Sequence, residues 1–190
     1  GESINIAFYN NLTKSIWLSI KNIGIVDIPL NKEKEPELKL IKDVELPNEN
    51  AINPRCITFD GNSKIYLGSN GYLGYYENEK WTTIEIPNSE YNISDLKVTK
   101  KNELIISVYD EGVYLSKGNY FRHLTTSDGL ASMLIRNIFI DTKNRIWLSS
   151  KNGITLINQD EISIFRESNG LPNVNIEVIY EDFEGNIWFG

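Results

Sequence analysis

The sequence predicts an all-β fold, a β-propeller of four-stranded antiparallel blades, on three observations. A short apolar motif recurs along the chain, several strand-like segments surround each copy, and long stretches of helical periodicity are missing. The copies are spaced at roughly 40–45 residues, which is the repeat length of propeller blades. We therefore expect each repeat to form one blade.

The repeated motif is Ile-Trp-Leu-Ser or a variant of it. Its central residues are Trp17, Tyr66, Ile105, Trp147 and Trp188, and differences between their numbers give spacings of 49, 39, 42 and 41. The long first spacing comes from a charged insertion at 31–37, which we expect to be a loop. Three large apolar residues in a row predict that these middle strands are covered on both faces by neighbouring blades.

Four strands are expected in each repeat, in chain order. The first blade is expected at 4–9, 15–20, 23–28 and 38–44, and the second at 56–59, 65–67, 72–76 and 81–86. The third is expected at 93–98, 104–108, 113–116 and 120–124, and the fourth at 135–140, 145–149, 154–157 and 162–165. The repeats run approximately 1–50, 51–90, 91–130, 131–172 and 173–190, so the last is half a blade.

Turn residues separate the strands. The turn before the central strand begins with an aspartate six residues ahead of the aromatic, at Asp60, Asp141 and Asp182. Its carboxylate is suited to accepting hydrogen bonds from the backbone that follows. The fourth turn position needs a residue that tolerates positive φ, which Asn102, Asn144 and Gly185 satisfy and Lys14 fits less well. Glycines suited to the next turn are Gly71, Gly112 and Gly153.

Two further segments, Asp128-Gly129-Leu130-Ala131-Ser132 and Asn169-Gly170-Leu171-Pro172-Asn173, lead into such strands. The string Gly-Leu, apolar strand, Asp turn, Ile-Trp resembles the two-component regulator propeller repeat, most strongly over 125–190. The resemblance implies the extracytoplasmic, periplasmic sensor of a membrane-bound bacterial regulator, often a hybrid histidine kinase that responds to carbohydrate. It also implies further blades and an output domain as partners, and an oligosaccharide as the ligand.

Composition excludes several classes of protein. The chain has 190 residues and a net charge of −7, which argues against nucleic-acid binding. Cys56 and His123 are the single residues of their kinds, so a disulfide framework, a cysteine-rich zinc site and multi-histidine chemistry are excluded. We expect no catalytic residues, no metal and no cofactor. We take Cys56 as a small buried hydrophobe and His123 as a peripheral strand residue.

Ligand binding is expected in the polar, amide-rich loops that connect one blade to the next. The candidate residues are Asn50, Glu90, Tyr91, Asp128, Ser132 and Asn173. Tryptophan could offer a platform for sugar rings, but we expect Trp17, Trp147 and Trp188 to pack between blades and Trp81 to pack locally. The acidic run at 177–184 is expected to be a solvated face that a cation could also use.

Two other functions compete with sensing. A propeller lyase of the streptogramin-lyase type shares the turn and the Ile/Leu-Trp pair, but its chemistry needs a histidine base with metal-binding carboxylates. A structural or dimerisation propeller needs no ligand. Because propellers close with a whole number of blades, four and a half blades predict an incomplete ring, a single partial propeller over 1–190 and a fragment of a larger one. Its exposed edges would favour self-association.

Overall fold

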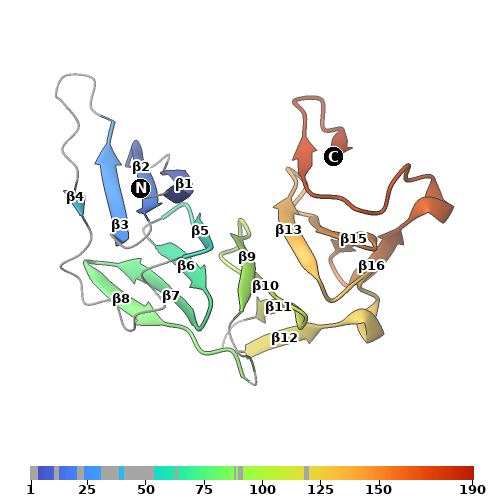
Figure 1. Cartoon of the computed structure of the whole chain (residues 1–190), viewed down its shortest axis with the longest axis horizontal. Coiled ribbons are helices and arrows are strands. Elements are labelled where there is room, and N and C mark those ends of the chain that lie inside the picture. Colours follow the sequence, from blue (N-terminus) through green and yellow to red (C-terminus); the bar gives the residue numbers. More distant parts are fainter. Residues whose placement is uncertain are drawn as a thin grey trace. The chain divides into compact units, whose positions relative to one another are not determined.

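The computed structural model describes residues 4–10, 13–20, 24–30, 39–40, 54–62, 64–87, 89, 92–117 and 120–190. The chain divides into two compact units, residues 1–93 and 94–190. The described strands form four four-stranded sheets and one two-stranded sheet, and each strand lies beside its neighbours in the chain (Figure 1). This confirms the predicted propeller blades, four complete and one half. The assignment of one domain over 1–190 stays a prediction.

The first unit contains two blades. The strands of the first blade are β1 (Ile4–Asn10), β2 (Ser15–Ile20), β3 (Gly24–Pro29) and β4 (Lys39–Leu40). Those of the second are β5 (Cys56–Phe59), β6 (Ile65–Ser69), β7 (Tyr72–Glu77) and β8 (Lys80–Thr83). The expected loop at 31–37 and the expected strand residues 41–44 lie outside the described part of the chain.

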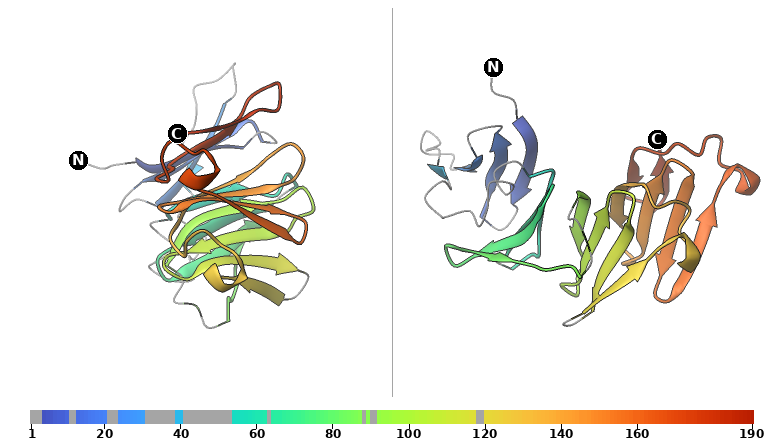
Figure 2. Two further views of the ribbon diagram at one scale, coloured as in Figure 1. Left: turned by 90° about the vertical axis from the view of Figure 1, so that its right-hand side faces the viewer. Right: turned by 60° about the horizontal axis from the view of Figure 1, so that its bottom comes forward.

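The second unit, which includes most of β9, contains two and a half blades. The third blade consists of β9 (Ile93–Val98), β10 (Leu104–Val108), β11 (Gly112–Lys117) and β12 (Tyr120–Leu124). The fourth consists of β13 (Ile135–Ile140), β14 (Ile146–Ser150), β15 (Gly153–Asn158) and β16 (Glu161–Phe165), and the half blade of β17 (Ile179–Glu181) and β18 (Ile187–Phe189). Figure 2 shows the third and fourth blades as neighbouring sheets. Two 3₁₀ turns, η2 (Thr126–Asp128) and η3 (Glu167–Asn169), begin the connections that follow β12 and β16.

Within each unit, apolar clusters lie between successive blades. In the first unit Trp17 packs with Ile57 and Leu67 of the second blade. Between the third and fourth blades, Ile105 shares a cluster with Leu148. Between the fourth blade and the half blade, Trp147 shares one with Ile176, Ile179 and Phe189. Trp17, Ile105 and Trp147 therefore each pack against the next blade of their own unit, as expected for Trp17 and Trp147.

The middle strands of the blades differ in burial. Strands β6 and β10 are buried along their whole length, and β14 at four of its five residues, which confirms the prediction for these blades. In β2 buried and half-buried residues alternate. The prediction that this strand is covered on both faces is therefore wrong. The described residues place a neighbouring blade on one side of the first blade, and a strand covered on one side alternates.

Trp188 is the second departure from the expected core. Its side chain is 60% exposed, whereas Trp147 at the same repeat position is 6% exposed. The half blade has two described strands, and no described residues cover the face that carries Trp188. A motif that favours burial is buried only where another element supplies the apolar surface.

The predicted turns have the expected backbone geometry. The fourth position of the turn has positive φ at Asn102 and Asn144, both 62°, and at Lys14, 54°. Gly112 also has positive φ, 89°, in the turn between β10 and β11. A Cβ there would collide with the carbonyl oxygen of Leu124, so the close approach of β12 as well as the φ angle requires glycine.

Candidate functional site

An aspartate at the head of the turn connects the backbone and side chains of the repeat. In the fourth blade the Asp141 side chain is 1% exposed. Its Oδ1 accepts a hydrogen bond from the Arg145 backbone N–H at 2.8 Å. Its Oδ2 accepts from Arg145 Nε at 2.5 Å and from the indole Nε1 of Trp147 at 2.9 Å. Burial alone would raise the pKa of Asp141, but these hydrogen bonds and the Arg145 charge outweigh it and hold the pKa below its ordinary value.

The half blade repeats this arrangement on an exposed surface. Asp182 Oδ1 accepts from the backbone N–H groups of Glu184 and Asn186 at 3.0 and 2.9 Å. Its Oδ2 accepts from the indole Nε1 of Trp188 at 2.7 Å. The hydrogen bonds from Trp188 and Asn186 lower the pKa of Asp182 to about 2. The bond between turn and indole therefore forms even where the indole is exposed.

In the other described turns, the side chain at the head of the turn also accepts hydrogen bonds from the backbone, but the central residue of the motif is not a tryptophan. Asp60 Oδ1 accepts from the backbone N–H groups of Asn62 and Lys64 at 2.8 and 3.2 Å. In the third blade Thr99 takes the place of the aspartate, and its Oγ1 accepts from the backbone of Lys101 and Glu103 at 3.2 and 3.1 Å. The central residue there is Ile105, which has no N–H donor for a carboxylate. The prediction that these aspartates form turns is confirmed.

The turn carboxylates are not arranged as a metal site. Within the described residues, no three His, Cys, Asp or Glu side chains gather closely enough to hold a metal ion. In the acidic run, Glu177 pairs with Arg136 at 3.0 Å and Glu181 accepts from the Thr142 backbone and hydroxyl at 2.7 Å. Both carboxylates thus connect the half blade to the fourth blade.

Three of the six residues predicted for ligand binding are described. Asp128 Oδ2 accepts from both the backbone N–H and the hydroxyl of Thr125 at 2.9 Å, which closes η2 and lowers the pKa of Asp128. Ser132 is 6% exposed and its Oγ accepts from the Leu134 N–H at 3.1 Å. Asn173 Oδ1 accepts from the Asn175 N–H at 2.9 Å. All three side chains therefore support local turns, and their role in binding stays a prediction.

The remaining three candidates, Asn50, Glu90 and Tyr91, lie outside the described residues.

Three other residues considered in the sequence, Cys56, Trp81 and His123, take part in packing or in local contacts. Cys56 is buried, and Trp81, 6% exposed, packs against Tyr76 with ring centroids 5.1 Å apart and ring planes tilted by 49°. His123 lies on the exposed strand β12, stacked on Tyr114 at 4.1 Å with its Nε2 2.6 Å from the Glu111 carbonyl oxygen. These positions confirm the structural interpretation of all three residues.

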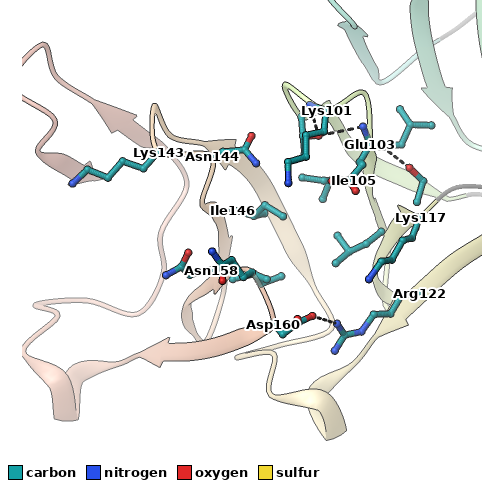
Figure 3. A pocket seen from close by; sticks show the side chains of 16 residues that line it. Lys101, Glu103, Ile105, Lys117, Arg122, Lys143, Asn144, Ile146, Asn158 and Asp160 are labelled. Atoms are coloured by element: carbon teal, nitrogen blue, oxygen red, sulfur yellow. Dashed lines mark hydrogen bonds and ion pairs between the residues drawn. The ribbon is translucent and has the colours of Figure 1, made fainter.

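A pocket of about 540 Å³ lies between the third and fourth blades, within the second unit (Figure 3). Its lining combines aliphatic side chains from the inter-blade core with polar and charged side chains from turns and outer strands. These residues are Thr99, Lys101, Glu103, Leu104, Ile105, Leu115, Ser116, Lys117, Arg122, Lys143, Asn144, Ile146, Ile157, Asn158, Gln159 and Asp160. The three predicted binding residues that the structure describes, Asp128, Ser132 and Asn173, are not among them.

Within the second unit, the pocket lies at the opposite end of the sheets from the connections that contain Asp128, Ser132 and Asn173. Its turn residues come from the connections between the first and second strands and between the third and fourth strands, for example Asn144 and Asp160. Asp128, Ser132 and Asn173 lie in connections between blades, where each fourth strand ends. A signal for the pocket was present in the sequence, because the third repeat departs from the motif at Thr99 and Ile105.

Fold and turn geometry together define a β-propeller assembled from Asp-turn repeats. Residues 170–190 match the family model described as "Two component regulator propeller", which confirms the resemblance seen in the sequence. The matched segment contains the Asp182 turn and Trp188. No curated protein sequence gives a significant match to the chain.

Solved structures share this fold at low sequence identity. The extracellular domain of a hybrid two-component system from B. thetaiotaomicron is similar with a TM-score of 0.76 and 18% identity, over 100% of this chain and 26% of that one. A second such domain from the same organism is similar with a TM-score of 0.74 and 15% identity, over 100% of this chain and 28% of that one. Virginiamycin B lyase from Staphylococcus aureus is similar with a TM-score of 0.72 and 17% identity, over 96% of this chain and 61% of that one. The chain thus spans about a quarter of the length of the two extracellular domains.

The described part of the chain contains no helix with the length and hydrophobicity needed to span a bilayer.

Proposed function

We propose that these residues are part of the ligand-sensing propeller of an extracytoplasmic receptor in a two-component signalling system. The observation that carries the proposal is the match of residues 170–190 to the two-component regulator propeller. The likeness to two extracellular domains of hybrid two-component systems supports it. The role is non-enzymatic: the propeller binds a ligand, and differential binding to two receptor conformations passes the signal on.

A carbohydrate is the proposed ligand class, and the periplasm the proposed location. Both follow from the resemblance, and the amide-rich connections between blades supply donors and acceptors suited to sugar hydroxyls. The loop containing Asn173 and Asn175 is an example, because both side chains are exposed at the end of the fourth blade.

The likeness to virginiamycin B lyase keeps a propeller lyase as the second candidate. Such chemistry needs a histidine base beside metal-binding carboxylates. His123 instead stacks on Tyr114 and faces a backbone carbonyl, on an outer strand. This geometry favours the sensor over the lyase.

The proposal is tested first on the coding sequence that flanks these residues. We expect a membrane-spanning segment and a kinase or other output domain on the same polypeptide. Glycan-array binding by the full-length product then tests the ligand class. A flanking sequence without any membrane segment or output domain would overturn the receptor assignment, and a receptor that signals to glycans without binding any would overturn direct sensing.

A further inference from the structure

The central motif position controls how completely the space between two blades is filled. Trp147 packs against Phe165 and Phe189, with ring centroids 6.1 and 5.7 Å away, and closes the space between the fourth blade and the half blade. Trp17 packs against Tyr76 of the second blade, with centroids 6.0 Å apart. At both positions an indole reaches an aromatic partner across the space between blades.

The third blade has Ile105 at this position, and the pocket lies in front of it. Ile105 belongs to the apolar cluster shared with the fourth blade and also lines the pocket. Isoleucine is smaller than tryptophan, so it leaves open part of the space that an indole fills in the first and fourth blades. Thr99, which replaces the aspartate that would accept the indole N–H, lines the same pocket. The two departures of the third repeat from its motif therefore coincide with the cavity.

The charge of the pocket is opposite to that of the chain. Its lining has four cationic residues, Lys101, Lys117, Arg122 and Lys143, against two carboxylates, Glu103 and Asp160. The chain as a whole has 19 basic and 26 acidic residues.

The individual cations differ in their contacts. Arg122 forms an ion pair with Asp160 at 3.5 Å, and in Figure 3 Lys143 extends away from the hollow. Lys101 and Lys117 border the hollow from the third blade (Figure 3), and neither ammonium group forms an ion pair with a described carboxylate. These two lysines are therefore available to an anion.

We propose that this pocket binds a small organic anion, a carboxylate or sulfate carried on a body with one apolar face. The apolar face lies against the aliphatic floor formed by Ile105, Ile146 and Ile157, and burial of that surface favours binding. The anionic group lies near Lys101 and Lys117, where charge-assisted hydrogen bonds are available. Asn144 and Asn158 offer amide groups to the remaining polar atoms.

The binding test uses the 190-residue chain and three probes that share an aromatic ring. The probes are para-nitrophenyl β-glucuronide, para-nitrophenyl sulfate and the neutral para-nitrophenyl β-glucoside, each titrated by calorimetry. We expect at least one anionic probe to bind about tenfold more tightly than the glucoside, with an affinity that falls as salt is added. The glucuronide and the sulfate distinguish a sugar acid from a sulfated ligand.

Two kinds of variant locate the site. T99D/I105W restores the motif, returns an indole to the space between blades and is expected to abolish binding of the anionic probe. K101E and K117E are each expected to weaken it about tenfold or more. K151E makes the same charge change in the turn between β14 and β15, outside the pocket, and is expected to leave binding unchanged. Circular dichroism and thermal unfolding confirm that each variant is folded.

Several results would overturn the proposal. These are equal affinity for charged and neutral probes, no binding of any probe by the folded chain, or binding that K101E and K117E leave intact. The lysine variants keep the test decisive if T99D/I105W does not fold. Use of the pocket in signalling rests on the proposed receptor function. If the chain binds the probes but the flanking sequence contains no receptor, only the proposed receptor function is contradicted. If the flanking sequence contains a receptor but the propeller does not bind the probes, only the proposed anion pocket is contradicted.

Discussion

Asp141 and Trp147 form a unit, although six residues separate them in the chain. One carboxylate oxygen holds the turn through the Arg145 backbone, and the other accepts the indole N–H. The same pair recurs in Asp182 and Trp188, and both members are replaced together in Thr99 and Ile105. A buried carboxylate without a donor would be unfavourable, which explains why the third blade keeps a hydroxyl for the backbone but loses the second acceptor.

Replacing Asp141 by Asn is expected to lower the free energy of unfolding by about 2 kcal/mol, because buried donors on Arg145 and Trp147 lose a charged acceptor. Urea denaturation at neutral pH measures the change. Asp160→Asn is the matched control, since its ion pair with Arg122 is exposed and should change stability by about 0.5 kcal/mol or less. Equal effects of the two substitutions would contradict the role given to Asp141.

The lowered pKa of Asp141 predicts a dependence of stability on acid. Its stabilising charge is fully present above the ordinary aspartate pKa of about 3.9 and is lost as the pH falls through the lower pKa of the folded state. We therefore expect the wild-type chain to lose stability in this acidic range more steeply than Asp141→Asn. Unfolding curves collected from neutral pH down to about pH 3 compare the two slopes. Parallel curves would show that Asp141 is not a source of the acid sensitivity.

Gly68 occupies a tightly packed position at the end of the motif. A Cβ at Gly68 would lie 2.6 Å from Cys56 Sγ and 2.6 Å from Ile93 Cγ2. Gly68→Ala is therefore expected to cost about 1–3 kcal/mol by overpacking, measured by urea denaturation. Ser149→Ala tests the equivalent position of the fourth blade, where the buried Oγ has no described hydrogen-bond partner, and should be close to neutral. A neutral Gly68→Ala would show that the neighbouring strand moves aside.

At the scale of elements, η2 and η3 show that the connections between blades repeat as faithfully as the strands. Each ends at a left-handed glycine, Gly129 with φ 106° and Gly170 with φ 94°. Each is closed by a side chain that accepts from the backbone three residues earlier, Asp128 from Thr125 and Asn169 from Arg166. The polar residues of these connections thus serve the fold first.

Asp128→Ala is expected to lower the melting temperature more than Asn169→Ala. Asp128 forms two charge-assisted bonds with Thr125, whereas Asn169 forms one neutral bond with the Arg166 N–H. Differential scanning calorimetry measures both variants. The reverse order would mean that the capping bond of Asp128 contributes little, and would return this carboxylate to the set of groups free for a ligand.

At the scale of the whole molecule, one face of the half blade is apolar and uncovered by described residues. Tyr180 and Trp188 pair across β17 and β18 and are each 60% exposed, and Val178 on the same side is 55% exposed. The opposite face packs on the fourth blade through Ile179 and Phe189. An apolar sheet face that is exposed to water is unfavourable.

We propose that the chain self-associates through this face. Sedimentation velocity is expected to show larger species as the concentration rises, and V178K/Y180K is expected to reduce them. Tyr120→Lys is the matched control, because Tyr120 is 59% exposed on the outer strand β12, away from that face. A wild-type chain that stays monomeric, or association unaffected by V178K/Y180K, would contradict the proposal.

Local sequence was sufficient for the strands, turns and blade order. The sequence pattern predicted these features directly, because each depends on residues that are neighbours in the chain. They are the Asp turns, the left-handed Asn102 and Asn144, and the order of strands within each blade. The site was harder to predict, because Asp128, Ser132 and Asn173 look like exposed polar residues but are engaged in turns.

The sequence by itself determined the all-β propeller, because the regular spacing of the motif and the strands around it reflect local interactions. Tertiary structure decided that Trp147 is buried while Trp188 is exposed, and that a pocket with four cationic residues lies beside Ile105 between two blades. The physical reason is that burial and cavity volume depend on the surface that another blade supplies. That surface is set by packing between residues far apart in the chain, which a repeat of about forty residues does not encode.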